Sequence, residues 1–136
     1  MRFPRTIIYD SIQYHFRDSQ KGLLAWDVRR LVKLSEHLPV RHIRVSAIAE
    51  VDENHWYSYG NVAPTCRSIV EHCALIRDSD LSIPIILDQA GRVMDGMHRV
   101  CKAILEGKEE LPAVQFEADP EPDYVACDPD LLPYNA

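Results

Sequence analysis

The chain has 136 residues, of which 46% are hydrophobic and 26% charged, and its formal net charge is −6. This length suits a single domain, residues 1–136, with its own core, and the composition is typical of a globular protein. The acidic balance makes DNA an unlikely partner, because non-specific DNA binding needs a basic surface. We find neither an apolar run of membrane-spanning length nor a signal peptide, and we expect a cytoplasmic protein.

The N-terminal part, residues 1–41, predicts a short strand at residues 6–9 and one helix. Asp27 is a good N-cap for that helix, and Pro39 lies just beyond its expected end. The expected buried face comprises Val28, Leu31, Val32 and Ser35. We expect this helix to pack over the rest of the domain. The alternative is a lid or a homodimer contact.

A strand and its exit are predicted at residues 42–51, followed by the acidic stretch Glu50-Val-Asp-Glu-Asn-His-Trp-Tyr57. One interpretation is a solvated loop anchored by Trp56. The other is a catalytic or metal-binding loop, because a carboxylate near a phosphoryl acceptor can take the hydroxyl proton or bind magnesium.

A helix is predicted over residues 64–76, with Pro64 in its first turn. Its expected buried stripe comprises Cys66, Ile69, Val70, Cys73 and Ile76. Thr65, Ser68 and His72 share another face. The chain has neither paired CxxC nor HExxH spacing, so we expect no structural zinc site.

The most informative stretch is residues 84–107, which predicts a β-hairpin that leads into a helix. Gly91 suits the hairpin turn, and Gly107 suits the position just past the helix end. The helix should begin at Met97, after Asp95-Gly96 breaks the second strand. The acidic, proline-rich tail, residues 118–136, should wrap the domain as an irregular but ordered strap.

The start of the helix at Met97 is a candidate phosphate site, because a helix N-terminus offers free N–H groups and a partial positive charge. Gly96 would let a ligand approach the backbone, while His98 and Arg99 would add donors. Asp95 would cap the helix, act as a general base or hold magnesium. The plainer interpretation is a capped helix with an exposed His-Arg pair.

The segment Asp95-Gly96-Met97-His98-Arg99, preceded by a hairpin and followed by Lys102-Ala103, resembles the signature of the ParB/sulfiredoxin superfamily. The resemblance covers about residues 42–117, and its motif is closest to that of free-serine-kinase-like members. It implies an α+β fold, in which helices pack on a small mixed sheet.

The resemblance also implies a site for ATP or ADP with Mg²⁺. Catalytic roles would fall on Glu50 and Asp95. The nucleotide and phosphate contacts would come from Gly96, Met97, His98, Arg99, Ser68, His72 and Arg67. Met97 stands where sulfiredoxins have their cysteine, and a thioether cannot act as a thiolate nucleophile, so sulfiredoxin activity is excluded.

The expected function is therefore nucleotide binding with phosphoryl transfer or nucleotide hydrolysis on a small-molecule substrate, as in an ATP/ADP-dependent kinase or an NTPase. The alternative is a non-enzymatic nucleotide-sensing or protein-interaction module. A ParB-like nuclease is less favoured, because no helix-turn-helix domain follows residue 117 and the chain is acidic.

Overall fold

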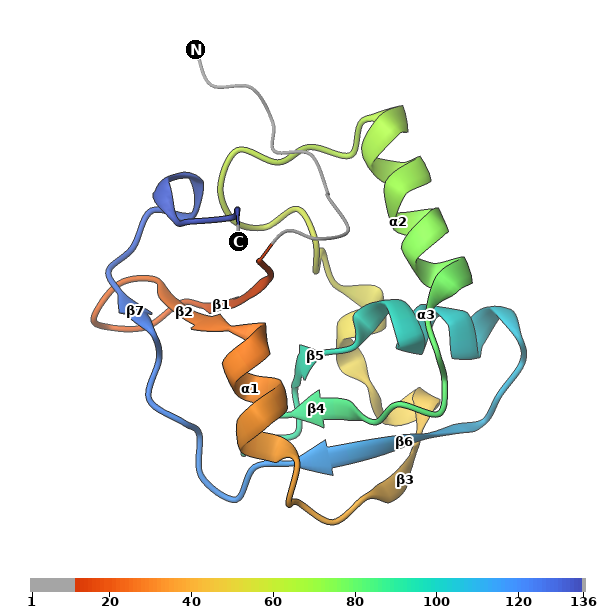
Figure 1. Cartoon of the computed structure of the whole chain (residues 1–136). Coiled ribbons are helices and arrows are strands. Elements are labelled where there is room, and N and C mark those ends of the chain that lie inside the picture. The colour runs from red at the N-terminus through yellow and green to blue at the C-terminus, as the bar shows by residue number, and fades with distance from the viewer. Residues whose placement is uncertain (1–11, 136) are drawn as a thin grey trace.

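Two small sheets and three helices make up residues 12–135, the part of the chain that the computed structural model describes (Figure 1). The first sheet contains β1 (Tyr14–Arg17), β2 (Leu24–Asp27) and β7 (Tyr124–Val125), in the order β1-β2-β7. The second contains β3 (Arg41–Arg44), β4 (Ile85–Leu87), β5 (Val93–Asp95) and β6 (Glu110–Gln115), in the order β3-β6-β4-β5. The helices are α1 (Val28–Ser35), α2 (Cys66–Asp78) and α3 (Met97–Leu105). The predicted α+β class is confirmed; the strand expected at residues 6–9 lies outside the described residues.

The second sheet is mixed, because α3 returns the chain so that β6 runs parallel to β4 while β3 and β5 run antiparallel to their neighbours. The hairpin of β4 and β5 is confirmed. Its turn is closed by the Gly91 N–H, which donates to the Asp88 carbonyl at 3.0 Å, and Gly91 has φ +85°. This hairpin brings the Asp95-Gly96 pair to the start of α3.

Helices cover both faces of the second sheet, so its central strand β4 is buried on both sides (Figure 1). On the α3 side the core contains Ile48, Ile85, Leu87, Val93, Met97, Val100, Ala103, Leu111 and Ala113. On the α1 side it contains Trp26, Leu31, Ile86, Met94, Val114 and Phe116. The start of α3 is therefore held by a packed core.

The helix α1 begins as predicted, with the Asp27 carboxylate accepting the Arg29 N–H at 2.9 Å. Leu31 and Ser35 are buried on its inner face. Val32, expected on the same face, is exposed, because α1 ends after eight residues and covers only a narrow strip of the sheet.

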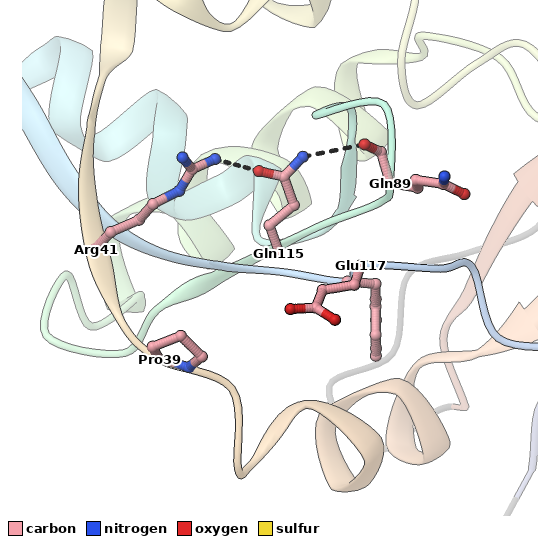
Figure 2. Close-up of a pocket in the computed structure, with 6 residues that line it drawn as sticks. Pro39, Arg41, Gln89, Gln115 and Glu117 are labelled. Atoms are coloured by element: carbon pink, nitrogen blue, oxygen red, sulfur yellow. Dashed lines mark hydrogen bonds between the residues drawn. The ribbon is translucent and has the colours of Figure 1, made fainter.

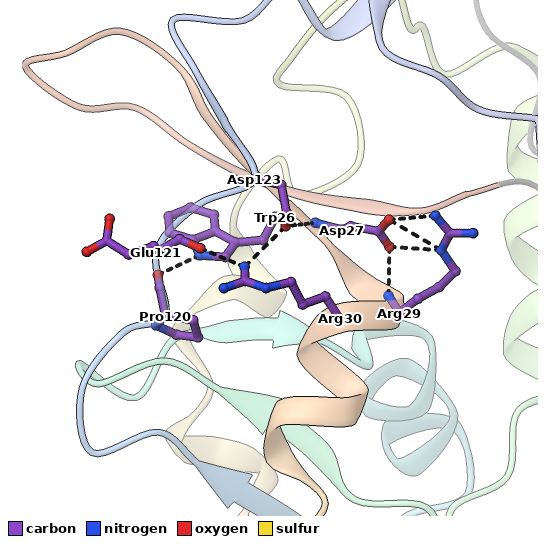
Figure 3. A network of polar contacts seen from close by, with 7 residues as sticks. All are labelled: Trp26, Asp27, Arg29, Arg30, Pro120, Glu121 and Asp123. Carbon is purple, nitrogen blue, oxygen red and sulfur yellow. Dashed lines mark hydrogen bonds and ion pairs between the residues drawn. The ribbon is translucent and has the colours of Figure 1, made fainter.

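The tail is ordered, as expected, and is fastened to β2 and α1 (Figure 3). Trp26 donates its indole N–H to the Pro120 carbonyl at 2.8 Å, and Arg30 donates to the Glu121 carbonyl at 2.7 Å. The Asp123 carboxylate accepts the Asp27 N–H at 2.8 Å. The tail also supplies β7 and a short 3₁₀ turn, Pro129–Leu131, which the sequence pattern did not predict.

Trp26→Phe should lower the free energy of unfolding by about 2 kcal/mol, because it removes a half-buried hydrogen bond to Pro120 and leaves part of the buried indole volume empty. Urea unfolding measured by circular dichroism checks this. A loss below about 0.5 kcal/mol, the usual size of a surface substitution, would show that the tail is not held through Trp26.

The predicted buried stripe of α2 is wrong. Ile69 is 48% exposed and Val70 65%, and Cys66 and Cys73 are exposed as well. The inward face is the polar one, which buries His72. The physical reason is that α2 packs on α3 and on a polar, aromatic loop, so its apolar stripe is turned away from both. Among residues 12–135, no helix has the length and apolar character that crossing a bilayer requires.

Candidate functional site

A cavity of about 630 Å³ is lined by residues of both sheets. Its walls are β1, the end of β5, the first turn of α3, the inner face of α2, and residues 53–62, here called the roof loop. In Figure 1 the roof loop runs from the centre of the molecule over to the start of α2. Tyr134 of the tail also lines the cavity. Segments between Gln13 and Tyr134, at the two ends of the described part of the chain, therefore meet here.

Most of the sequence-predicted site residues line this one cavity: Glu50, Ser68, His72, Asp95, Gly96, Met97 and His98. Arg67 and Arg99 do not line it. Arg67 is exposed on α2. The structure thus brings together carboxylates, imidazoles and the first turn of a helix, but it leaves out the two arginines expected to bind phosphate.

Gly96 is the N-cap of α3 and has the left-handed conformation, with φ +111°. A Cβ atom there would lie 2.6 Å from Cγ2 of Ile85, so the glycine is required for close packing of α3 on β4. The expectation that Asp95 caps the helix is wrong, because no side chain caps α3. The Asp95 carboxylate instead accepts a hydrogen bond from Arg99 at 3.0 Å.

Arg99 is turned back toward β5 rather than into the cavity. Its side chain is 13% exposed and forms an ion pair with Asp95. The phosphate clamp expected from Arg99 is therefore not formed in this arrangement. Instead, the guanidinium neutralises a carboxylate at the cavity wall.

Arg99→Ala should destabilise the fold by about 1–2 kcal/mol, because it leaves the half-buried Asp95 carboxylate without its partner. Thermal unfolding monitored by circular dichroism measures the loss. Arg77→Ala is the matched control, since Arg77 also pairs with an aspartate, Asp78, but on the surface. Equal melting temperatures for the two variants would contradict a stabilising role for the Asp95–Arg99 pair.

His72 and His98 form a stacked, hydrogen-bonded pair under Trp56. Nδ1 of His72 lies 2.8 Å from Nε2 of His98. The indole stacks on both imidazoles, with ring centroids 4.1 Å away for His72 and 4.7 Å for His98. Tyr57 completes the contact between the roof loop and α2, because its hydroxyl lies 2.9 Å from the Ser68 hydroxyl.

Both imidazoles are neutral at pH 7. Burial lowers the pKa of His72 to about 4, and burial together with the neighbouring His72 lowers the pKa of His98 to about 4. Burial also lowers the pKa of His55, which lines the same cavity. His98 can therefore offer a ligand a neutral hydrogen-bonding group, but not a positive charge.

Glu50 is a buried carboxylate, only 4% exposed, on the short 3₁₀ turn Ala49–Asp52. One of its oxygens accepts a hydrogen bond from the Val93 N–H of β5. The other oxygen accepts no hydrogen bond from residues 12–135, and the side chain lines the cavity. A carboxylate fixed at one oxygen and open at the other is suited to accept a proton from a ligand.

The sequence analysis missed Arg17, Arg92 and Asp88 in the cavity wall, whereas it had included Glu53 in the acidic loop. Arg17 donates to the buried Asp88 carboxylate at 2.8 Å, and Arg92 pairs with Glu53 of the roof loop. The hairpin-turn position of Asp88 could have drawn attention to it. Arg17 lies in a stretch with no clear periodicity, so no local signal placed it here.

The residues present do not build a magnesium site from protein groups alone. Within residues 12–135, no group of three or more His, Cys, Asp or Glu side chains is placed to hold a metal ion. Asp95 is already engaged by Arg99. Glu50 forms no ion pair with a side chain of residues 12–135, although the pKa of Arg92 is raised by its hydrogen bond to Glu53 and by the nearby charge of Glu50. Magnesium commonly binds through one or two carboxylates plus substrate phosphates, and these residues fit only that mode.

A second, shallower pocket of about 310 Å³ lies at the sheet edge and holds none of the predicted site residues (Figure 2). Arg41 donates to the Gln115 side chain, which in turn donates to the Gln89 carbonyl at 3.2 Å. These polar groups satisfy one another.

The larger cavity therefore remains the candidate site. No protein-family model, curated protein or solved structure matches this chain.

Proposed function

We propose that the cavity binds a nucleotide, ATP or ADP. The protein would then either transfer a phosphoryl group from the nucleotide to a small molecule or hydrolyse the nucleotide. The observation that carries the proposal is that the first turn of α3 and the buried Glu50 line the same cavity of about 630 Å³. That volume lies within the usual range for small-molecule sites.

The phosphates would lie against the first turn of α3. The N–H groups of Met97 and His98 belong to the first helical turn and have no partner within the helix. The partial positive charge of the helix end favours an anion there. The ion pair with Arg99 offsets the charge of Asp95, which would otherwise repel phosphate.

Glu50 would act as the general base that takes a proton from the attacking hydroxyl or water. The bond from the Val93 N–H to one oxygen holds the side chain in place, and Glu50 lines the cavity. Mg²⁺ carried by the nucleotide would neutralise phosphate charge when bound. A correctly placed general base typically contributes a factor of about 10²–10⁴ in rate.

The finer fold assignment is part of the same proposal. The mixed sheet, the hairpin of β4 and β5, and the Asp95–Arg99 motif at the start of α3 support a ParB/sulfiredoxin-like fold. In the resemblance, this motif follows a hairpin and begins a helix, and residues 95–99 do the same here.

A second candidate function is nucleotide sensing without turnover. It is favoured by the contact between the tail and the roof loop, where the Asp130 carboxylate accepts the Asn61 N–H at 2.8 Å. Tyr134 of the tail lines the cavity as well. A bound ligand could thus change the position of the tail, where a partner protein would detect it.

Glu50→Gln distinguishes the two functions. It should leave ATP affinity within about threefold and reduce phosphate release or transfer at least 100-fold. Calorimetric titration measures the affinity, and a phosphate-release assay measures the rate. Glu36→Gln is the matched control, because Glu36 is exposed and does not line the cavity. Binding with no turnover in the wild-type protein would favour sensing, and no binding would contradict both functions.

A further inference from the structure

One end of the cavity is walled by aromatic rings from segments far apart in the sequence. We call Tyr14, Phe16, Tyr59 and Tyr134 the aromatic end; they come from β1, the roof loop and the tail. In Figure 1, β1 lies on the opposite side of the molecule from α2. We call the part of the cavity wall formed by α2 and the start of α3 the polar end, and this is where we place the phosphates.

The rings of the aromatic end are mutually supported. The rings of Tyr14 and Tyr134 meet edge to face with centroids 5.3 Å apart, and those of Phe16 and Tyr59 lie 5.9 Å apart. Such contacts hold aromatic side chains in fixed orientations. A planar ligand would meet a wall that is already formed.

The tyrosine hydroxyls of the aromatic end are bonded to the protein. Tyr14 donates to the Pro133 carbonyl, and Tyr134 donates to the Pro129 carbonyl at 2.5 Å. Tyr59 donates to the Asp18 carboxylate at 3.2 Å. What these side chains can present to a ligand is therefore ring surface rather than donors and acceptors.

Resting on the nucleotide function proposed above, we infer that the aromatic end is a stacking subsite for the base of the nucleotide and accepts purines and pyrimidines alike. Every base has an aromatic face, so stacking tolerates changes of base, whereas hydrogen bonds to base edges discriminate between them. The phosphates at α3 and the base at β1 would together span the cavity.

The test is calorimetric titration of the full chain with MgATP, MgCTP and inorganic tripolyphosphate. We expect ATP and CTP to bind within about fivefold of each other and tripolyphosphate to bind at least tenfold more weakly. Phe16→Leu, which keeps an apolar side chain but removes the ring, should weaken both nucleotides about tenfold and leave tripolyphosphate unchanged.

Phe116→Leu is the matched control, since it makes the same change at a buried phenylalanine that does not line the cavity. Equal affinities for tripolyphosphate and ATP, unaffected by Phe16→Leu, would overturn the stacking subsite and leave the phosphate site standing. CTP binding more than fiftyfold weaker than ATP would overturn the tolerance of the base. No binding of any of the three would refute the proposed function itself.

Discussion

Gly96→Ala should lower the free energy of unfolding by about 3–4 kcal/mol. Two costs add: the left-handed φ of +111° is unfavourable for any residue with a Cβ, and the new methyl group would lie 2.6 Å from the buried Ile85 side chain. Ile85 is fully buried in the central strand β4 and cannot move aside. Urea unfolding followed by circular dichroism measures the loss.

Gly107→Ala is the control that separates these two costs. Gly107 also has a positive φ, +69°, but no atom lies within 4 Å of the position its Cβ would take. We therefore expect a loss of only about 1 kcal/mol, the conformational cost alone. If both variants lose the same stability, the close contact between Gly96 and β4 is not what requires the glycine.

Lowering the pH from 7 to 4 should destabilise the fold by several kcal/mol. The pKa values of His72 and His98 are about 4 in the folded protein, against about 6.5 in the unfolded chain. As the pH falls below 6.5 the unfolded chain takes up protons first, so stability that is fully present above pH 6.5 is lost progressively toward pH 4. Each histidine contributes on the order of 2 kcal/mol.

The pH range in which stability is lost distinguishes histidines from carboxylates. Carboxylates such as Asp27, whose pKa the Arg29 hydrogen bond holds below its usual value, lose their contribution only below about pH 4. Urea unfolding at pH 7, 5.5 and 4.5 therefore isolates the histidines. His98→Gln should reduce the dependence in this window, and His15 and His55 should account for part of the rest, because burial lowers the pKa of His15 to about 3 and also lowers the pKa of His55. A wild-type stability that stays constant from pH 7 to 4.5 would contradict a buried neutral pair.

The parts of the fold that could be predicted are those fixed by neighbouring residues. The β4–β5 hairpin follows from its turn residues, and the start of α1 follows from the capping carboxylate of Asp27. Likewise the start of α3 after Gly96 follows from the change in hydrophobic period. Each signal acts within a few residues, so it survives without knowledge of the tertiary contacts.

The orientation of α2 could not be predicted, because it depends on what lies beneath the helix. Apolar periodicity predicts which residues share a face, and Ile69 and Cys73, four residues apart, are both exposed. The opposite face is nevertheless the buried one, since Trp56 of the roof loop stacks on His72. A histidine that stacks on tryptophan carries no signature in its local sequence.

Helix geometry could have predicted that His98 lines the cavity while Arg99 does not. Successive residues of an α-helix point about 100° apart, so two neighbours rarely reach the same ligand. Arg99 is also four residues after Asp95, and Arg99 turns back to pair with this carboxylate. The aromatic end, in contrast, joins β1 to the tail across more than a hundred residues, and no pattern in the sequence links them.

The most direct test of the central claim, that the cavity holds a nucleotide, uses the two tryptophans of the wild-type protein. Trp56 lines the cavity, whereas Trp26 is buried in the α1-side core and its N–H is bonded to Pro120. In a ¹H–¹⁵N spectrum titrated with MgATP, the indole signal of Trp56 should shift saturably while that of Trp26 stays in place. An unchanged Trp56 signal at saturating nucleotide would contradict the claim.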